Sequence, residues 1–556
     1  MAACFQVGGE HMVRRFSAIV CSVAVVGIAT WAAGQRRDPK VPSRPVSLFE
    51  PSDRCMACHN NLVTPAGEDV SIGQSWRGSM MANSSRDPYW QASVRRETID
   101  HPRAKEAIED ECSKCHMPMM RFEAKTAGQK GTVFTHLPFM HDAERASQLA
   151  ADGVSCTVCH QITDEGLGRP ESYVGNFSID TTRPQGDRPV FGPFEIDQGR
   201  TTIMRSATGY KQTETKHIQK SELCATCHTL LTRALGPNGE EIGELPEQVP
   251  YQEWLHSSYR EEKSCQDCHM PKVTGDMPIA AVLGEPREGL SRHNFRGGNF
   301  FITQMLHKNR GELGVRALPQ ELELATRVAR DYLQTETAEV AVDRVGLQNG
   351  NLETVVSVKN LSGHKFPTAY PSRRAWLHVT VKDANGNAVF ESGKLMPNGS
   401  IRGNDNDADA KKYEPHYSEV RNAEEVQIYE SIIVDRAGSV TTGLLSALRY
   451  VKDNRLLPRG FNKANAEEQI AVHGAASTDD DFTGGSDRVR YVADVSRAQG
   501  PFTVDVALMF QPVGYRWAEN LRTYEAAEVK RFNSYYDSMA AASAVVVSSA
   551  SVRTGN

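Results

Sequence analysis

Short segments with alternating apolar and polar residues, or with many β-branched residues, occupy much of the second half of the chain. They lie at residues 352–358, 375–381, 426–434, 488–495 and 502–510. Both patterns are typical of strands, and Asn385-Gly386 has the sequence of a tight hairpin turn. Several short strands separated by turns favour a β-sandwich. We therefore expect a β-sandwich domain over residues 338–515.

A helical pattern separates these strands from the first half of the chain. Over residues 319–334, apolar side chains recur every three or four positions, which predicts a connecting helix within 318–337. After the strands, residues 516–556 are predicted to form a C-terminal helix and a tail. Residues 49–317 lack such regularity, and Gly- and Pro-bearing stretches such as 166–193 predict loops between short helices. The expected fold class is α+β and multidomain, with a mainly helical, irregular domain before the β-sandwich.

The N-terminus has the order of a secretory signal. Arg14 and Arg15 precede an apolar run over residues 16–33 that ends in small residues. We assign residues 1–34 to a signal peptide and 35–48 to a linker, and expect a periplasmic or other extracytoplasmic location in a bacterium. The alternative is an uncleaved anchor that attaches the protein to a membrane, although a spanning helix usually needs about 20 apolar residues.

Overall composition is informative mainly about which classes of binding partner it does not favour. The chain has 556 residues, enough for two or three domains, and a net charge of −6. This balance does not favour nucleic acid or an anionic membrane surface as a partner. Composition alone therefore indicates a soluble multidomain protein, and the function has to be inferred from motifs.

Cysteine usage is the strongest chemical signal in the sequence. Of 12 cysteines, two lie in the signal region and ten form five copies of Cys-x-x-Cys-His. The copies are Cys55, Cys58 and His59; Cys112, Cys115 and His116; Cys156, Cys159 and His160; Cys224, Cys227 and His228; and Cys265, Cys268 and His269. This motif is typical of covalent c-type haem attachment, because cysteines three residues apart share one face of a helical turn and reach one porphyrin. The histidine that follows is then the proximal iron ligand.

Other uses of paired cysteines explain the pattern less well. A disulfide framework does not require a histidine after each pair. Zinc ribbons combine two Cys-x-x-Cys units, whereas this chain has an odd number of units and a histidine in each. The sequence therefore predicts five haem c groups held by ten cysteines and five proximal histidines.

Further phrases accompany these motifs. Met-Pro follows the motif histidine at His116 and His269, and distinctive stretches lie at 79–83, 293–299 and 363–368. In these features the chain resembles the soluble tetrahaem cytochromes that take electrons from hydroxylamine oxidoreductase, with a fifth haem motif and an added β domain. The resemblance implies a multihaem cytochrome that exchanges electrons with redox-partner proteins, whose identity it does not specify.

The second axial ligand decides what each iron can do. Two strong protein ligands suit electron transfer, whereas an open position can bind a small molecule. The candidate second ligands are His136, His141, His217, His293, His364 and, for the first haem, Met80. Each histidine could instead be held by hydrogen bonds, and Met80 could instead pack in a core.

An acidic run in the β domain raises the question of calcium. Asp405, Asp407 and Asp409 resemble the start of a calcium loop, but the sixth position lacks glycine and His416 stands where the bidentate glutamate belongs. We interpret the run as a solvated loop, with calcium as the less favoured alternative.

These observations favour an electron-transfer protein over an enzyme. We expect a multihaem cytochrome c that carries electrons between redox partners in the cell envelope. The alternative is an oxidoreductase that reduces a small nitrogen or sulfur compound at one haem with an open axial site. Pentahaem nitrite reductases have lysine in place of one motif histidine, and all five motifs here end in histidine, which argues against that class.

Overall fold

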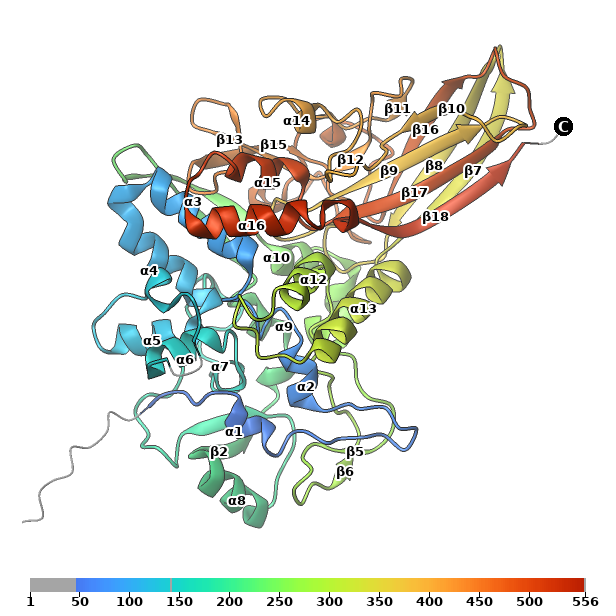
Figure 1. Ribbon diagram of the computed structural model, residues 1–556. Helices are drawn as coiled ribbons and strands as arrows, with labels where there is room; N and C mark the ends of the chain where they lie inside the picture. Colours follow the sequence, from blue (N-terminus) through green and yellow to red (C-terminus); the bar gives the residue numbers. More distant parts are fainter. Residues whose placement is uncertain (1–46, 141–142, 555–556) are drawn as a thin grey trace, which may run out of the picture. The chain divides into compact units, whose positions relative to one another are not determined.

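The computed structural model describes residues 47–140 and 143–554 (Figure 1), which belong to one compact unit, Ser47–Asn556. The predicted signal peptide, all of the predicted linker except its last two residues, and His141 lie outside the described residues. Within these ranges, no helix combines the length and the apolar character needed to cross a membrane.

The haem-motif region, residues 49–317, consists of short helices joined by irregular segments (Figure 1). Its helices are α1 Asp53–Met56, α2 Ile72–Arg77, α3 Pro88–Asp100, α4 Lys105–His116, α5 Pro118–Thr126, α6 Arg145–Ala151, α7 Cys156–Cys159, α8 Gln198–Thr208, α9 Ser221–Ala225, α10 Pro250–Leu255, α11 Cys265–His269 and α12 Phe300–Lys308. Each cysteine pair lies in or directly beside one of the short helices α1, α4, α7, α9 and α11, as the motif spacing predicts. The strands of this region pair only in twos: β1 Pro189–Gly192 with β2 Lys211–Glu214, β3 Leu230–Leu235 with β4 Glu241–Gln248, and β5 Met277–Pro278 with β6 Pro286–Arg287.

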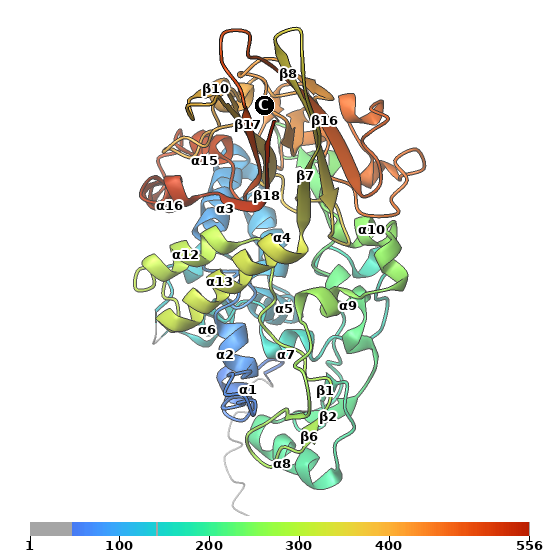
Figure 2. The same cartoon turned by 90° about the vertical axis from the view of Figure 1, so that its right-hand side faces the viewer.

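The predicted connecting helix is present as α13, Pro319–Glu336. Pro319 occupies its first turn, where a missing N–H costs nothing. Its buried residues include Leu322, Ala329 and Leu333, which lie on the apolar face predicted from the sequence. The helix packs against α12, and the two run side by side in Figure 2.

The second half contains two facing sheets. One has the order β10 Ala388–Ser392, β9 Arg374–Lys382, β17 Thr503–Gln511 and β18 Val545–Arg553, with β12 Ile428–Tyr429 also paired to β9. The other has the order β11 Glu419–Val420, β16 Ser486–Asp494, β8 Asn351–Asn360 and β7 Ala338–Gln348. A smaller sheet contains β14 Val440–Thr441, β13 Ser431–Asp435 and β15 Ala447–Asp453, and α14 Asp405–Ala408 lies in a loop. Val356 and Val489 of one large sheet share a core with Val379 and Val506 of the other, so the predicted α+β fold class is confirmed.

The C-terminal segment differs from the expected helix and tail. It contains α15 Tyr515–Leu521 and α16 Ala527–Asp537, and then strand β18, which pairs antiparallel with β17 along its whole length. The expectation of a tail over the last residues was therefore wrong. Serines alternate weakly with valines and alanine in β18, so the strand is determined by the neighbour it pairs with rather than by its own pattern.

A continuous core joins the two halves. Tyr89 of α3 and Phe300 of α12 belong to the same buried cluster as Phe510 of β17 and Phe532 of α16. Helix α16 packs on α3. The β-sandwich therefore rests directly on helices of the haem-motif region, and its loops can reach residues of that region.

Candidate functional site

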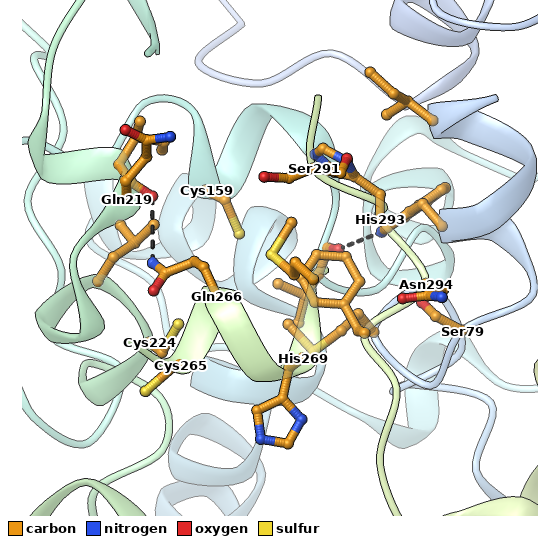
Figure 3. A pocket seen from close by; sticks show the side chains of 18 of the residues that line it. Ser79, Cys159, Gln219, Cys224, Cys265, Gln266, His269, Ser291, His293 and Asn294 are labelled. Atoms are coloured by element: carbon orange, nitrogen blue, oxygen red, sulfur yellow. Dashed lines mark hydrogen bonds between the residues drawn. The ribbon is translucent and has the colours of Figure 1, made fainter. Parts of the chain in front are cut away.

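A single large cavity collects most of the cysteine–histidine motifs. Its volume is about 1200 Å³, and the cysteines and histidines of the first, third, fourth and fifth motifs all line it. Figure 3 shows part of it, with Cys159, Cys224 and Cys265 close to His269 and His293. Residues of the second motif do not line this cavity. Four motifs that lie far apart in the sequence therefore share one space.

The walls of this cavity suit a large, flat apolar group. Helix α8 has no buried residue, although Ile203, Met204 and Ala207 on it line the cavity. Ile203 is 47% exposed, and Leu283, on the wall near the first motif, is 60% exposed. Apolar walls left uncovered by protein usually mark a binding site. All ten motif cysteines have free thiols, so the residues present fit the haem groups predicted from the sequence.

Backbone carbonyls orient four of the five motif histidines. In each of these rings Nδ1–H donates to a carbonyl, which leaves the Nε2 lone pair free to bind a metal. The pairs are His59 with Ile279 at 2.6 Å, His116 with Ser84 at 2.9 Å, His160 with Phe191 at 2.6 Å, and His269 with Arg296 at 2.6 Å. The imidazole ring of His228 has no hydrogen-bond partner among the described residues. The fourth motif therefore differs from the others in how its ring is held.

Two non-motif histidines face motif histidines in parallel pairs. The ring centroids of His160 and His293 are 6.4 Å apart with 15° between the planes. Those of His269 and His364 are 6.1 Å apart with 10° between the planes. Two imidazoles that bind one metal from opposite sides, each through a bond of about 2 Å, have centroids about 6 Å apart. Both pairs thus have the spacing of two axial ligands.

The second ring of each pair is also oriented by the backbone. His293 donates from Nδ1 to the Ser291 carbonyl at 2.9 Å, and His364 donates to the Lys365 carbonyl at 2.9 Å. Burial lowers the pKa of His293 to about 4, and it lowers the pKa of His269, the motif histidine of the other pair, to about 4 as well. These rings are therefore neutral at pH 7, which is the state in which imidazole binds a metal.

Thiols of different motifs lie in contact. Cys55 of the first motif is within hydrogen-bonding distance of Cys156 of the third. Cys224 of the fourth motif lies beside Cys265 of the fifth (Figure 3), and a third contact of this kind joins the fourth motif to the second, between Cys227 and Cys115. Groups attached at these thiols would be immediate neighbours.

The remaining candidate ligands are placed differently. Both ring nitrogens of His136 have hydroxyl partners, Ser147 at 2.8 Å and Thr132 at 3.1 Å. Both nitrogens of His217 are also engaged, by the Thr215 hydroxyl and the Ile162 carbonyl, each at 2.8 Å. Neither of these two histidines lines the cavity.

Three motif histidines have no second imidazole opposite them. In the described part of the chain, His59, His116 and His228 form no ring pair with another histidine. His116 instead stacks on Trp90, with centroids 4.3 Å apart. Met80 lines the same cavity as His59 and remains a candidate on the side of the first motif.

The acidic run that resembled a calcium loop is used for structure. Both oxygens of Asp407 accept from Arg374, at 2.8 and 2.9 Å, in a buried ion pair. Asp405 and Asp409 do not join any cluster of potential metal ligands within the described residues. The expectation of a solvated loop was therefore wrong for Asp407, which is buried, and in the described residues the three aspartates do not gather as the ligands of the less favoured calcium alternative.

One other cluster, which the sequence did not indicate, brings His416 close to Asp479 and Asp487. The amide groups of Gln427 and Asn454 donate to His416 Nδ1 at 2.9 and 3.0 Å. Neither amide can be reversed, because each amide oxygen accepts a backbone N–H, from Tyr417 and from Glu430 respectively. The ring hydrogen must then be on Nε2, the atom that faces the two carboxylates. A hydrogen on Nε2 leaves no lone pair on that nitrogen for a metal ion.

The carbonyl partners of the motif histidines could not be found from the sequence. Ser84, Ile279 and Phe191 act through backbone oxygens, so their side chains carry no signal for this role. Arg296 is the exception, since it lies in the 293–299 phrase noted above.

Comparisons with known proteins support the fold. No family model matches the chain, and no curated protein matches it. Among solved structures, a penta-heme cytochrome c552 from Thermochromatium tepidum is similar, with a TM-score of 0.52 and 15% sequence identity over 92% of this chain and 100% of that chain. At this identity the likeness concerns the fold alone, and the chain has the fold of a multihaem c-type cytochrome.

Proposed function

We propose that this protein is a multihaem cytochrome c that carries electrons between redox-partner proteins in the cell envelope. Ten motif cysteines anchor five haems, and the motif histidines are the proximal ligands. The observation that carries the proposal is the pair of parallel imidazole couples, His160–His293 and His269–His364, at the spacing of axial ligands inside a cavity lined by four motifs.

The residues of the chain have distinct tasks in this proposal. When bound, each haem iron accepts and releases one electron. The Nδ1–H donors of His59, His116, His160 and His269 fix each ring and raise the basicity of its ligating nitrogen. Apolar walls such as α8 keep water away from the groups.

The thiol contacts support a path for electrons. The first motif adjoins the third through Cys55 and Cys156, and the fourth adjoins both the second and the fifth. Cys159 of the third motif and Cys224 of the fourth line the same cavity (Figure 3), which supports a further step between these two motifs. The inferred order is first, third and fourth, with a branch to the second and the fifth.

The second ligands are assigned only where the geometry supports them. We assign His293 to the iron of the third motif and His364 to that of the fifth. Met80 remains the candidate for the first motif. We assign no iron to His136 or His217, because protein groups occupy both nitrogens of each ring.

The extracytoplasmic location belongs to this proposal too. Its support is the secretory pattern of residues 1–34 and the haem motifs themselves, since c-type haem is attached after export. Membrane association through an uncleaved N-terminal segment is the competing outcome. N-terminal sequencing of the protein purified from its native host distinguishes a start near residue 35 from an intact N-terminus.

An oxidoreductase is the second candidate function. Its support is the absence of a histidine ring pair at His59, His116 and His228 among the described residues. An iron with one strong protein ligand can bind a small nitrogen or sulfur compound. Carbon monoxide added to the reduced protein should change the Soret spectrum if such an iron exists, and should leave it unchanged if every iron has two strong ligands.

The main test counts haems and then removes ligands. Intact mass spectrometry should give the polypeptide mass plus five haems, and a bare mass with free thiols would refute the proposal. The variants H293A and H364A should each convert one of the five haems from low spin to high spin, measured by electron paramagnetic resonance. The matched control is H217A, which should leave all five signals unchanged.

A further inference from the structure

The loop that carries His364 crosses from the β-sandwich into the cavity. It connects β8, which ends at Asn360, with β9, which begins at Arg374. Tyr259 of the haem-motif region donates its hydroxyl hydrogen to the Leu361 carbonyl at 2.8 Å, and Phe366 pairs with Leu456 through backbone hydrogen bonds. The β-sandwich thus supplies the ring that faces His269, and contacts on both sides fix the loop.

One buried carboxylate of the haem-motif region holds this loop directly after the histidine. Glu253 lies on α10 and is 0% exposed. Its Oε2 accepts from the Lys365 backbone N–H at 3.1 Å and from the Thr368 hydroxyl at 2.5 Å. A buried N–H and hydroxyl left without this acceptor would be strongly unfavourable, so the loop position depends on Glu253.

The same carboxylate belongs to a balanced group of buried charges. Arg455 lies 3.0 Å from Glu253 Oε1 and also pairs with Asp453 at 2.8 Å. Lys365 pairs with Asp453 at 2.7 Å. Two acids thus offset two bases, all of them buried. Removing the charge of Glu253 would leave one positive charge in excess, close to His364.

We infer that Glu253 is the positioning residue for the second axial ligand of the fifth motif, and that its negative charge lowers the reduction potential of that iron. The inference rests on the proposed function, in which His364 is that ligand. Two observations carry it: the two hydrogen bonds from the loop to Glu253 and the place of Glu253 in a neutral buried charge group. A negative charge near an iron stabilises the ferric form.

Two substitutions separate the geometric role from the charge. E253Q keeps an acceptor oxygen for the loop but removes the charge. The spin state of every haem should stay as in the unsubstituted protein, and one of five reduction potentials should rise in a spectroelectrochemical titration of the full-length holoprotein. E253A removes both, so one haem of five should become high spin and bind carbon monoxide when reduced. Added imidazole should then restore its low-spin spectrum.

A matched control tests whether any buried glutamate has these effects. Glu430 is also buried and pairs with Lys452 at 2.9 Å, and it makes no hydrogen bond to residues 361–368. E430Q should reduce stability and leave all five spin states and potentials unchanged. If E430Q shifts a potential as E253Q does, the specific role of Glu253 is refuted.

The outcomes also separate this inference from the proposed function. If H364A converts one further haem to high spin but E253A leaves every spin state unchanged and E253Q leaves all potentials unchanged, the role of Glu253 is wrong and the ligand assignment stands. If H364A leaves every spin state unchanged, the ligand assignment is wrong and the inference falls with it. If E253A does not fold, the potential measured in E253Q decides.

Discussion

The haem-motif region and the β-sandwich bury their polar groups in different ways. In the β-sandwich, the buried cations Arg374 and Lys452 are each paired with a carboxylate, Asp407 and Glu430, although Asp487 is buried there with the Tyr429 hydroxyl as its partner. In the haem-motif region, Glu247 is buried and accepts from the Thr232 hydroxyl at 2.6 Å, and no cation pairs with it among residues 47–140 and 143–554. That region also exposes apolar walls to its cavity. The comparison teaches that the interior of the β-sandwich is filled by protein side chains, whereas the haem-motif region leaves apolar side chains uncovered around a large cavity.

The largest expected effect comes from removing one of those groups. Under the proposed function, C156S/C159S prevents attachment of the third haem, so the walls formed by α7 and α8 would lose the group that covers them. We expect amide hydrogen exchange of residues 145–215 to approach the unprotected rate, while β8, β9 and β17 remain protected. Exchange measured by mass spectrometry tests this, and equal protection of both regions in the variant would contradict the comparison.

A buried ion pair of the β-sandwich should give the next largest effect. D407A leaves Arg374 as an uncompensated buried charge, which costs about 3–5 kcal/mol of unfolding free energy. Denaturant titration monitored by circular dichroism measures the loss. The Soret spectrum should stay unchanged before unfolding, because neither residue of the pair lines the cavity. A spectral change at zero denaturant would show that the two regions are not independent in this respect.

Substituting the buried carboxylate Glu247 of the haem-motif region should raise the free energy of unfolding, whereas D407A should lower it. Burial raises the pKa of Glu247 to about 7, so the folded state favours the protonated form. The folded protein therefore loses stability as pH rises from about 4.5 to 7, and this loss persists above pH 7. E247Q removes the titration and should stabilise the protein at pH 8 by about 3 kcal/mol, with little change at pH 4.5. Unfolding titrations at the two pH values test this prediction. Equal effects of E247Q at both values would show that the pKa of Glu247 is not raised.

Much of the fold could be predicted from local patterns. Alternating residues predicted β9 and β17, and helical spacing predicted α13, because each buries one face. The strands β7 and β18 were missed. Much of β7 is exposed, and β18 contains three serines, so neither carries a clear apolar alternation. Their pairing depends on neighbours distant in the sequence.

The candidate functional site could be predicted only in part, because it too depends on contacts between residues distant in the sequence. Motif spacing indicated the cysteines and proximal histidines, and the turn around His364 indicated a residue able to reach a haem. Which histidine faces a given motif histidine depends on where a loop of one region meets a helix of the other, as His364 meets His269. No local sequence pattern contains that information. His217 stands near a motif in the sequence, yet both its nitrogens have protein partners.

The smallest expected effect concerns the contact between the two regions. Arg95 of α3 donates two hydrogen bonds to Glu528 of α16, both at 2.9 Å, in a partly buried position. E528Q should reduce the free energy of unfolding by about 1 kcal/mol, because a bidentate, partly buried ion pair stabilises a protein more than an exposed ion pair does. The control E525Q removes the exposed partner of Lys530 and should change stability by less than about 0.5 kcal/mol. Equal effects of the two substitutions would mean that the pair does not help to hold α16 on α3, and that the shared apolar core alone joins the two regions.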